Sequence, residues 1–244
     1  MTSRSAICFS ALITLFASMR PSQTDANLVK GEVRLVNSKE AAVKKKNDFS
    51  GVVVWLTPAG MSSPPLARKH AQMLQKDKRF TPHILAIQAG TTVDFPNRDP
   101  IFHNAFSNFD GQIFDIGLYP PGSSRSIQFT KPGIVKVFCN IHPSMSATIV
   151  VVSSSYFAVP DESGKYSFSD VPDGAYQIHF FHERATPETL DKLVQTIVVN
   201  KSGYELASTT ISEAGYLAAA HKNKYGRDYP SDADTADGYS VPIR

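Results

Sequence analysis

The sequence predicts an all-β protein that contains two β-sandwiches. Short apolar runs rich in Val, Ile and Phe recur along the 244 residues, and groups of Gly, Pro and Asn separate them. Runs of this length and spacing are typical of strands joined by tight turns in a sandwich or barrel. Over residues 80–152 no helical periodicity competes with this pattern. The pattern of turns and strands changes from residue 156 onward, which predicts the second sandwich.

The first 26 residues have the pattern of a secretory signal peptide. A short basic start precedes an apolar run over residues 5–19, and Ala26 supplies a small residue at the cleavage position. This run is too short and too early to predict a stable membrane anchor, although an uncleaved anchor is the alternative. Cleavage would remove Cys8 and leave Cys139 as the one cysteine, so we expect no intramolecular disulfide. We therefore expect a periplasmic or secreted protein.

Charge and motif content exclude several classes of function. The chain carries 25 Lys and Arg against 22 Asp and Glu, a net charge of +3. A charge this small gives no reason to expect binding to nucleic acid or to an anionic membrane. The sequence has no His-x-His pair, nucleophile elbow, phosphate loop or zinc-protease helix. We therefore expect a protein that is not an enzyme.

The chain up to residue 79 predicts two strands and a linker. Residues 28–36 alternate between apolar and polar, and residues 51–56 are rich in Val, so both segments predict strands. The three lysines at 44–46 are expected at a solvated hairpin tip, with a docking patch as the alternative. Residues 59–79 are expected to form a basic linker with a helical turn at 71–76. Such a linker is usually solvated, but it could instead face an acidic redox partner.

Residues 80–152 predict the first complete sandwich. Pro and Gly pairs, Gly90 and Asn97 mark turns between its strands. The expected strands cover residues 84–89, 91–95, 127–130, 134–138 and 147–152.

The loop between the last two of these strands contains three donor residues at equal spacing. Cys139, His142 and Met145 lie three residues apart, and Pro143 keeps the loop from becoming a helix. A tight loop can turn the sulfur and nitrogen donors of all three side chains towards one point. Soft Cys and Met donors with one His indicate copper, and a second His would complete a trigonal set with a weak axial ligand. The obvious supplier is His103, upstream in the same segment.

These residues resemble those of the cupredoxins, the plastocyanin family of blue copper proteins. The Cys-two-His-two-Met spacing is similar to the short ligand loop of amicyanin, whereas plastocyanin has a longer gap before its Met. His103-Asn104 resembles the first His of the family and the Asn that follows it. Residues 80–152, about a third of the chain, also resemble the cupredoxin region of bacterial methylamine-utilisation-like proteins. The segments 95–99 and 114–119 carry that second resemblance.

The resemblance implies a Greek-key cupredoxin sandwich with one type 1 copper. His103, Cys139 and His142 would be the equatorial ligands, and Met145 would be the weak axial ligand. Asn104 would hydrogen-bond to the Cys-bearing strand as a brace. The function implied is transfer of single electrons between Cu(II) and Cu(I), with a periplasmic redox partner such as a c-type cytochrome or a dehydrogenase.

The resemblance also implies where a partner would dock. The ring edge of His142 would lie nearest the surface, in an apolar patch where redox partners bind. Ile141 and Pro143 are candidates for that patch, together with Phe102 or Phe106.

Alternatives to this interpretation remain open on sequence grounds. Zinc is the main rival metal because His, Cys and His also suit it, and the Met position argues against it. A copper carrier or sensor without redox turnover is the alternative function, and a surface binding module is a third. His179 and His182 are three residues apart on an expected strand. They would therefore face opposite sides, which does not favour a second metal site.

Residues 156–212 resemble a carboxypeptidase-regulatory-like sandwich of the transthyretin type. The steps Gly164-Lys165-Tyr166-Ser167-Phe168 and then Pro172 to Tyr176 carry this resemblance. That family opens with a Gly-x-Val strand and a Val-rich strand, which residues 31–33 and 52–54 resemble. Our hypothesis is that residues 28–58 and 154–212 form one discontinuous sandwich into which the cupredoxin is inserted. The alternative is that the strand at 52–56 pairs with 134–138.

The remaining residues, 213–244, are expected to form a mobile tail. A short helix is expected over residues 212–221, and the sequence beyond it is rich in Asp, Gly, Ser and Pro.

Overall fold

The computed structural model describes residues 27–60, 66–108, 111–218 and 220–234. Over these residues it has eighteen strands and two short helices, which confirms the predicted all-β class. None of the helices described is long and apolar enough to cross a membrane. The predicted signal peptide lies outside the described residues.

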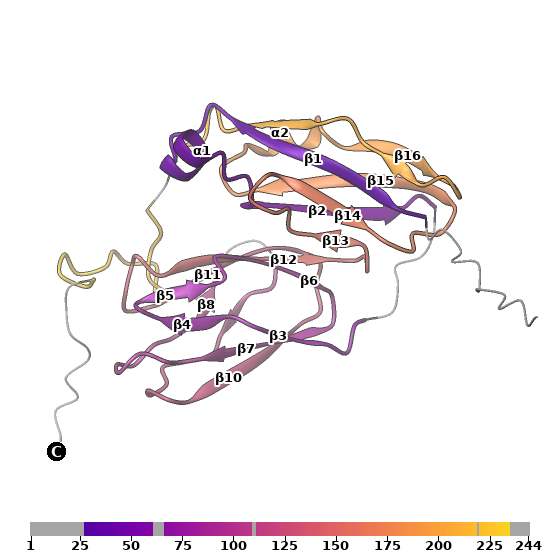
Figure 1. Ribbon diagram of the computed structural model, residues 1–244. Coiled ribbons are helices and arrows are strands. Elements are labelled where there is room, and N and C mark those ends of the chain that lie inside the picture. The colour runs from indigo at the N-terminus through magenta and orange to yellow at the C-terminus, as the bar shows by residue number, and fades with distance from the viewer. Residues whose placement is uncertain (1–26, 61–65, 109–110, 219, 235–244) are drawn as a thin grey trace, which may run out of the picture.

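Two layered β-sandwiches lie one above the other (Figure 1). The first is built mainly from two sheets, ordered β14-β1-β17 and β13-β2-β15-β16, and β18 also pairs with β1. Its strands are β1 (Val29–Val36), β2 (Val52–Pro58), β13 (Phe157–Ala158), β14 (Lys165–Phe168), β15 (Gly174–His182), β16 (Gln195–Val199), β17 (Tyr204–Glu205) and β18 (Thr209–Ser212). Its two helices are α1 (Ala41–Lys46) and α2 (Pro187–Asp191).

The first sandwich joins strands from both ends of the chain. β2 pairs with β15 from Val52↔His182 to Pro58↔Tyr176, and β1 pairs with β14. These are the pairings that the discontinuous-sandwich hypothesis requires. The alternative partner of β2, the strand at 133–138, pairs instead with strands of the second sandwich. Gly31 lies opposite Tyr166 in this sheet, and a Cβ at Gly31 would collide with the tyrosine ring. This contact explains the glycine of the Gly-x-Val step.

The second sandwich contains the strands between the two parts of the first. Its sheets have the orders β10-β7-β3 and β6-β12-β11-β8-β9, with β4 and β5 as a separate hairpin. The strands are β3 (His70–Gln72), β4 (Leu74–Lys76), β5 (Arg79–Thr81), β6 (Ile84–Gln88), β7 (Thr91–Pro96), β8 (Phe106–Ser107), β9 (Phe114–Asp115), β10 (Ser124–Phe129), β11 (Gly133–Phe138) and β12 (Ser146–Val152).

The predicted linker is part of this second sandwich. β3 pairs in parallel with β7, and β4 pairs with β5. The helical turn predicted at 71–76 was wrong, because Met73 and Gln75 are both fully buried at a two-residue spacing, the period of a strand.

Two further local predictions were wrong. The lysines at 44–46 do not lie at the tip of a hairpin but form the last turn of the short helix α1. Asn47, whose backbone is in the left-handed conformation, ends that helix. The helix predicted over 212–221 does not form at the described positions of this range, because Thr209–Ser212 continues the sheet beside β1. The next residue, Glu213, is buried and accepts hydrogen bonds from His182 and Arg184.

The interface between the sandwiches has an apolar centre and a polar flank. Val53 and Phe181 of the first sandwich cluster with Val150 and Val152 of β12. Beside this cluster, His83 Nε2 of the second sandwich donates to Glu183 of the first at 2.9 Å.

The pair of His83 and Glu183 predicts a pH-dependent contribution to stability. The hydrogen bond to Glu183 raises the pKa of His83, and the carbonyl oxygen of Ser146 adds to this effect. A histidine whose pKa is raised in the folded state contributes its full stabilisation at a pH below the ordinary histidine pKa. This stabilisation is lost as the pH rises through the raised pKa of the folded state. Because the side chain is half exposed, we expect a contribution of about 1 kcal/mol or less.

Urea unfolding of the wild type and of His83→Gln tests this expectation. The stability difference between the two should be largest at acidic pH and should shrink above neutrality. His70→Gln is the control for a surface pair, because the His70 side chain is 71% exposed where it meets Asp94, so its contribution should be smaller. A difference for His83→Gln that stays constant with pH would contradict the prediction.

Candidate metal centre

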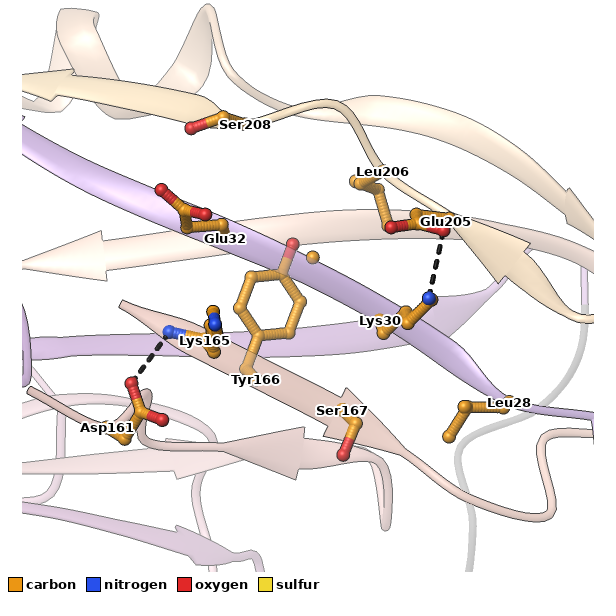
Figure 2. A pocket seen from close by; sticks show the side chains of 11 residues that line it. Leu28, Lys30, Glu32, Asp161, Lys165, Tyr166, Ser167, Glu205, Leu206 and Ser208 are labelled. Carbon is orange, nitrogen blue, oxygen red and sulfur yellow. Dashed lines mark hydrogen bonds and ion pairs between the residues drawn. The ribbon is translucent and has the colours of Figure 1, made fainter. Parts of the chain in front are cut away.

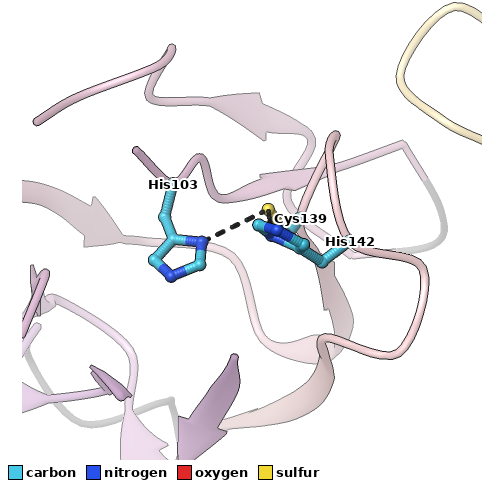
Figure 3. Close-up of side chains that lie close together, drawn as sticks. All are labelled: His103, Cys139 and His142. Atoms are coloured by element: carbon cyan, nitrogen blue, oxygen red, sulfur yellow. Dashed lines mark hydrogen bonds between the residues drawn. The ribbon is translucent and has the colours of Figure 1, made fainter. Parts of the chain in front are cut away.

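His103, Cys139 and His142 meet at one end of the second sandwich. Their ligand atoms all lie within 4.8 Å of one another, and all three residues are buried. The Cys139 Sγ lies 3.9 Å from His103 Nδ1 and 3.8 Å from His142 Nδ1. Figure 3 shows the His103 ring turned towards the sulfur. The structure thus brings together three of the four sequence-predicted donors.

These separations suit a single metal ion between the three atoms. Metal–nitrogen and metal–sulfur bonds of about 2.0 and 2.3 Å, as found for zinc, place donors roughly 3.5–3.7 Å apart. The observed distances of 3.8 and 3.9 Å lie just above this range. The donor set therefore fits a transition metal, and its geometry alone does not select one.

The strand pair β11–β12 positions the loop that supplies two of these donors. Cys139 follows the last residue of β11, and Met145 precedes the first residue of β12. The loop is closed because the Cys139 N–H donates to the Met145 carbonyl at 3.1 Å. The Met145 N–H in turn donates to the His142 carbonyl at 3.1 Å. Met145 is fully buried in the same apolar cluster as Cys139, so all four sequence-predicted ligands lie inside the sandwich.

His103 is fixed by its backbone and by its ring. Its backbone exchanges two hydrogen bonds with Tyr119. Its Nε2 donates to the carboxylate of Asp99 at 2.7 Å. That carboxylate also accepts the backbone N–H groups of Asp77 and Lys78 in the β4–β5 turn. A hydrogen bond from one ring nitrogen to a carboxylate leaves the other ring nitrogen free to bind a metal, and it makes that second nitrogen a stronger electron donor.

Asp99 is the residue that sequence analysis missed. Asp99 belongs to the segment 95–99 that carries the family resemblance, but no role was predicted for its side chain. The available signal was its position four residues before His103, but in a loop that spacing has no fixed structural meaning.

Asn104 makes the hydrogen bond expected of it. Its side-chain oxygen accepts the backbone N–H of Asn140, the residue after Cys139, at 3.2 Å. Its side-chain nitrogen donates to Asp115 at 2.8 Å. Asn104 therefore links the His103 loop to the Cys139 loop and to β9.

Burial favours the neutral forms of both imidazoles. It lowers the pKa of His142 to about 4, and the charges of His103 and Lys78 act in the same direction. Burial also lowers the pKa of His103, against the opposing effect of Asp99. Neutral rings keep a lone pair available for a metal ion.

Burial also favours the neutral form of the Cys139 thiol, which is not the form that binds a metal. Burial raises the pKa of Cys139, although nearby backbone N–H groups favour the thiolate. A bound cation would therefore have to displace the thiol proton.

His142 does not lie where the resemblance placed it. We expected its ring edge at the surface, but the residue is fully buried, and its Nε2 has no hydrogen-bond partner among the residues that the structure describes. The expected apolar patch is also changed, because Phe106 is buried and packs against Phe138. Both corrections have the same origin, since tertiary packing covers this end of the sandwich.

A hollow on the first sandwich offers no comparable donor set. It lies around β1 and β14, as Figure 2 shows. Its Lys30 pairs with Glu205 at 2.9 Å, and Asp161 accepts the Lys165 backbone N–H. Because Lys30 and Glu205 pair with each other on the surface, we assign no site to this hollow.

Comparisons with known proteins return cupredoxin structures. No family model matches the chain, and no curated protein matches it. A purple cupredoxin from Nitrosopumilus maritimus is 26% identical, covering 34% of this chain and 99% of its own, with a TM-score of 0.31. Amicyanin from Paracoccus versutus is 21% identical, covering 40% of this chain and 97% of its own, with a TM-score of 0.32.

A copper-containing nitrite reductase from Thermus scotoductus SA-01 is also similar. It is 25% identical and covers 49% of this chain, which spans 28% of the reductase, with a TM-score of 0.34. Because all three TM-scores are low, the assignment of the site rests on the residues themselves.

The contacts of Asn104 predict the effect of removing its side chain. In Asn104→Ala, the backbone N–H of Asn140 and the Asp115 carboxylate each lose a partner. We expect the metal-free protein to lose about 1–3 kcal/mol of unfolding free energy, measured by urea denaturation. Asn200→Ala, an exposed turn residue of the first sandwich, should change stability far less. Equal losses in the two variants would contradict the bracing role of Asn104.

Proposed function

We propose that this chain is a type 1 copper protein that carries single electrons. The observation that supports the proposal is the buried set of His103, Cys139 and His142, with Met145 in the same closed loop. Copper bound there would supply a Cu(II)/Cu(I) couple. The metal ligands themselves, including Met145 as the axial ligand, are part of this proposal.

The donor types favour copper over zinc. A thiolate and a thioether are soft ligands that stabilise Cu(I), while two imidazoles serve both oxidation states. Structural zinc sites usually take four strong ligands, and a thioether is a poor fourth. Met145 is therefore the residue on which the choice of copper depends.

The rigidity of the site favours electron transfer. Hydrogen bonds within the loop, from the Asn140 N–H to Asn104 and from His103 to Asp99 hold the donors in nearly one arrangement. A site that keeps its geometry when the charge of the metal changes has little to reorganise, so electrons move quickly. We propose an electron carrier rather than an enzyme, because the four proposed ligands are all buried.

The partner and the compartment belong to the proposal as well. The N-terminal signal pattern supports a periplasmic or secreted location. There, a c-type cytochrome or a dehydrogenase would exchange electrons with the site. One observation favours a second candidate function: because His142 is fully buried, the protein could instead hold copper as a carrier or sensor without redox turnover.

The visible spectrum is the first test of the proposed function. Mature protein mixed with Cu(II) should develop an intense blue thiolate-to-copper band that bleaches with reductant. Cys139→Ser should lack the band, because it removes the thiolate. A colourless wild-type protein that binds no copper would overturn the ligand assignment. If repeated oxidation and reduction restore the blue band at a constant reduction potential, the protein acts as an electron carrier. If they do not, the copper carrier is the better account.

Replacement of Met145 tests its axial role. Met145→Leu keeps the volume and apolar character of the side chain but removes the thioether. We expect the blue band to remain and the reduction potential to rise, because loss of the weak sulfur donor disfavours Cu(II). Met73→Leu, fully buried in the same apolar cluster, is the matched control. Potentials that do not differ between the two variants would exclude Met145 as a ligand.

A further inference from the structure

The C-terminal residues 221–234, here called the strap, run along the end of the second sandwich that holds the donors. In Figure 1 the strap is the yellow segment beside β4 and β5. It was expected to be a mobile tail, yet the residues described in it form hydrogen bonds with the ligand loop. Residues 235–244 lie outside the described residues.

Two side chains of the strap hold the ligand loop directly. The Tyr229 hydroxyl donates to the Cys139 carbonyl oxygen at 2.8 Å. His221 Nε2 donates to the Pro143 carbonyl oxygen at 2.8 Å. The His221 ring also stacks on Phe138, with ring centroids 4.0 Å apart. These contacts fix the loop on both sides of His142.

Two further strap residues tie down the rest of the loop. The Lys224 backbone N–H donates to the Asn140 side chain at 3.0 Å. Its ammonium group pairs at 2.8 Å with Asp115, the residue that also holds Asn104. Asp234 accepts hydrogen bonds from the backbone and hydroxyl of Ser144. The strap therefore contacts loop residues before and after His142.

The far end of the strap lies close to His142. Asp234 accepts hydrogen bonds from Ser144, two residues after His142, and the charge of Asp234 acts on the His142 ring. Ala233 is itself buried, which places this end of the strap against the protein. On the other side, the Lys78 ammonium of the β4–β5 turn donates to the Asp234 carbonyl at 3.0 Å. The strap and this turn thus meet close to His142.

The strap is held mostly by hydrogen bonds. Three of its residues, Lys224, Tyr225 and Arg227, are exposed or only partly buried. Segments with few buried apolar contacts open locally at a lower free energy than the core of a protein. A closed strap that opens without unfolding of the sandwich is therefore the expected behaviour.

We propose that the strap is a closing device of the metal centre, which positions the ligand loop and seals Cys139 and His142 from solvent, chelators and redox partners. Access to the site then requires the strap to open. Sealing of the thiol does not depend on which metal binds. The effect on copper rests on the proposed function.

The first experiment uses the metal-free, full-length protein and a thiol reagent such as dithionitrobenzoate. The reaction rate of Cys139 is compared among the wild type, Tyr229→Phe and the triple variant His221→Ala, Tyr229→Phe, Asp234→Ala. Loss of the single hydrogen bond in Tyr229→Phe should speed the reaction about fivefold. Because effects at neighbouring residues do not add fully, the triple variant should react at least tenfold faster than the wild type. Tyr225→Phe is the matched control, because this exposed tyrosine side chain forms no hydrogen bond with the ligand loop.

Two measurements separate sealing from a general loss of stability. The reaction of Cys139→Ser with the reagent measures the background from any thiol other than Cys139. The rate is also followed in low urea concentrations, where local opening depends weakly on denaturant and global unfolding depends strongly on it. Equal rates in the wild type and both strap variants, or rates that follow global unfolding, would overturn the proposal.

The second experiment uses the copper-loaded protein and follows extraction of Cu(I) by bathocuproine. The triple variant should lose copper roughly tenfold faster than the wild type, and Tyr225→Phe should not. If no variant binds copper, the proposed function fails while the thiol experiment still decides the role of the strap. If copper binds and its extraction rate is the same in all variants, the strap does not control access.

Discussion

The antiparallel pairing of β11 with β12 is the constraint on which the candidate site depends. Its register ends with Phe138 opposite Ser146, so the next two residues that face each other, just beyond the ends of the strands, are Cys139 and Met145. The hydrogen bond from the Cys139 N–H to the Met145 carbonyl continues the ladder by one step. A slip by one residue would turn every side chain to the other face of the sheet. Both sulfur donors would then lose their places, and so would His142 between them.

Burial of β12 on both faces secures that register. Ala147, Ile149 and Val151 face the core of the second sandwich. Val150 and Val152 face the first sandwich. A strand that is covered on both faces has apolar residues in succession instead of in alternation. This is why residues 149–152 of β12 are all Ile or Val. The first sandwich therefore supports the candidate metal centre by packing on the back of β12, the strand that follows Met145.

The two imidazoles of the site have different surroundings. His103 is fully buried and donates to Asp99, which holds it in one tautomer. His142 is also fully buried, but within the described part of the chain its Nε2 has no hydrogen-bond partner. A buried ring nitrogen without a partner costs free energy, so the packing that covers His142 must stabilise the protein elsewhere. The hydrogen bonds of Tyr229 and His221 with the loop are the contributions on the same side of the molecule.

Local pattern was enough to predict much of this protein. Strands β6, β7, β10, β11 and β12 of the second sandwich, and the equal spacing of Cys139, His142 and Met145, follow from β-branched runs, turn residues and donor chemistry, whereas the two-residue strands β8 and β9 were not predicted. Both the residue preferences of strands and the softness of sulfur donors are properties of a short segment alone.

Only the tertiary structure decided the strands inside the expected linker, the partner of His103 and the role of the C-terminal segment. Tyr229 and Cys139 are ninety residues apart, and Asp234 and Ser144 are equally distant. Contacts between such segments depend on how completed strands pack, and no periodicity in either segment encodes them. The sequence by itself thus determined which donors are available, whereas long-range packing decided that His142 is closed off from solvent.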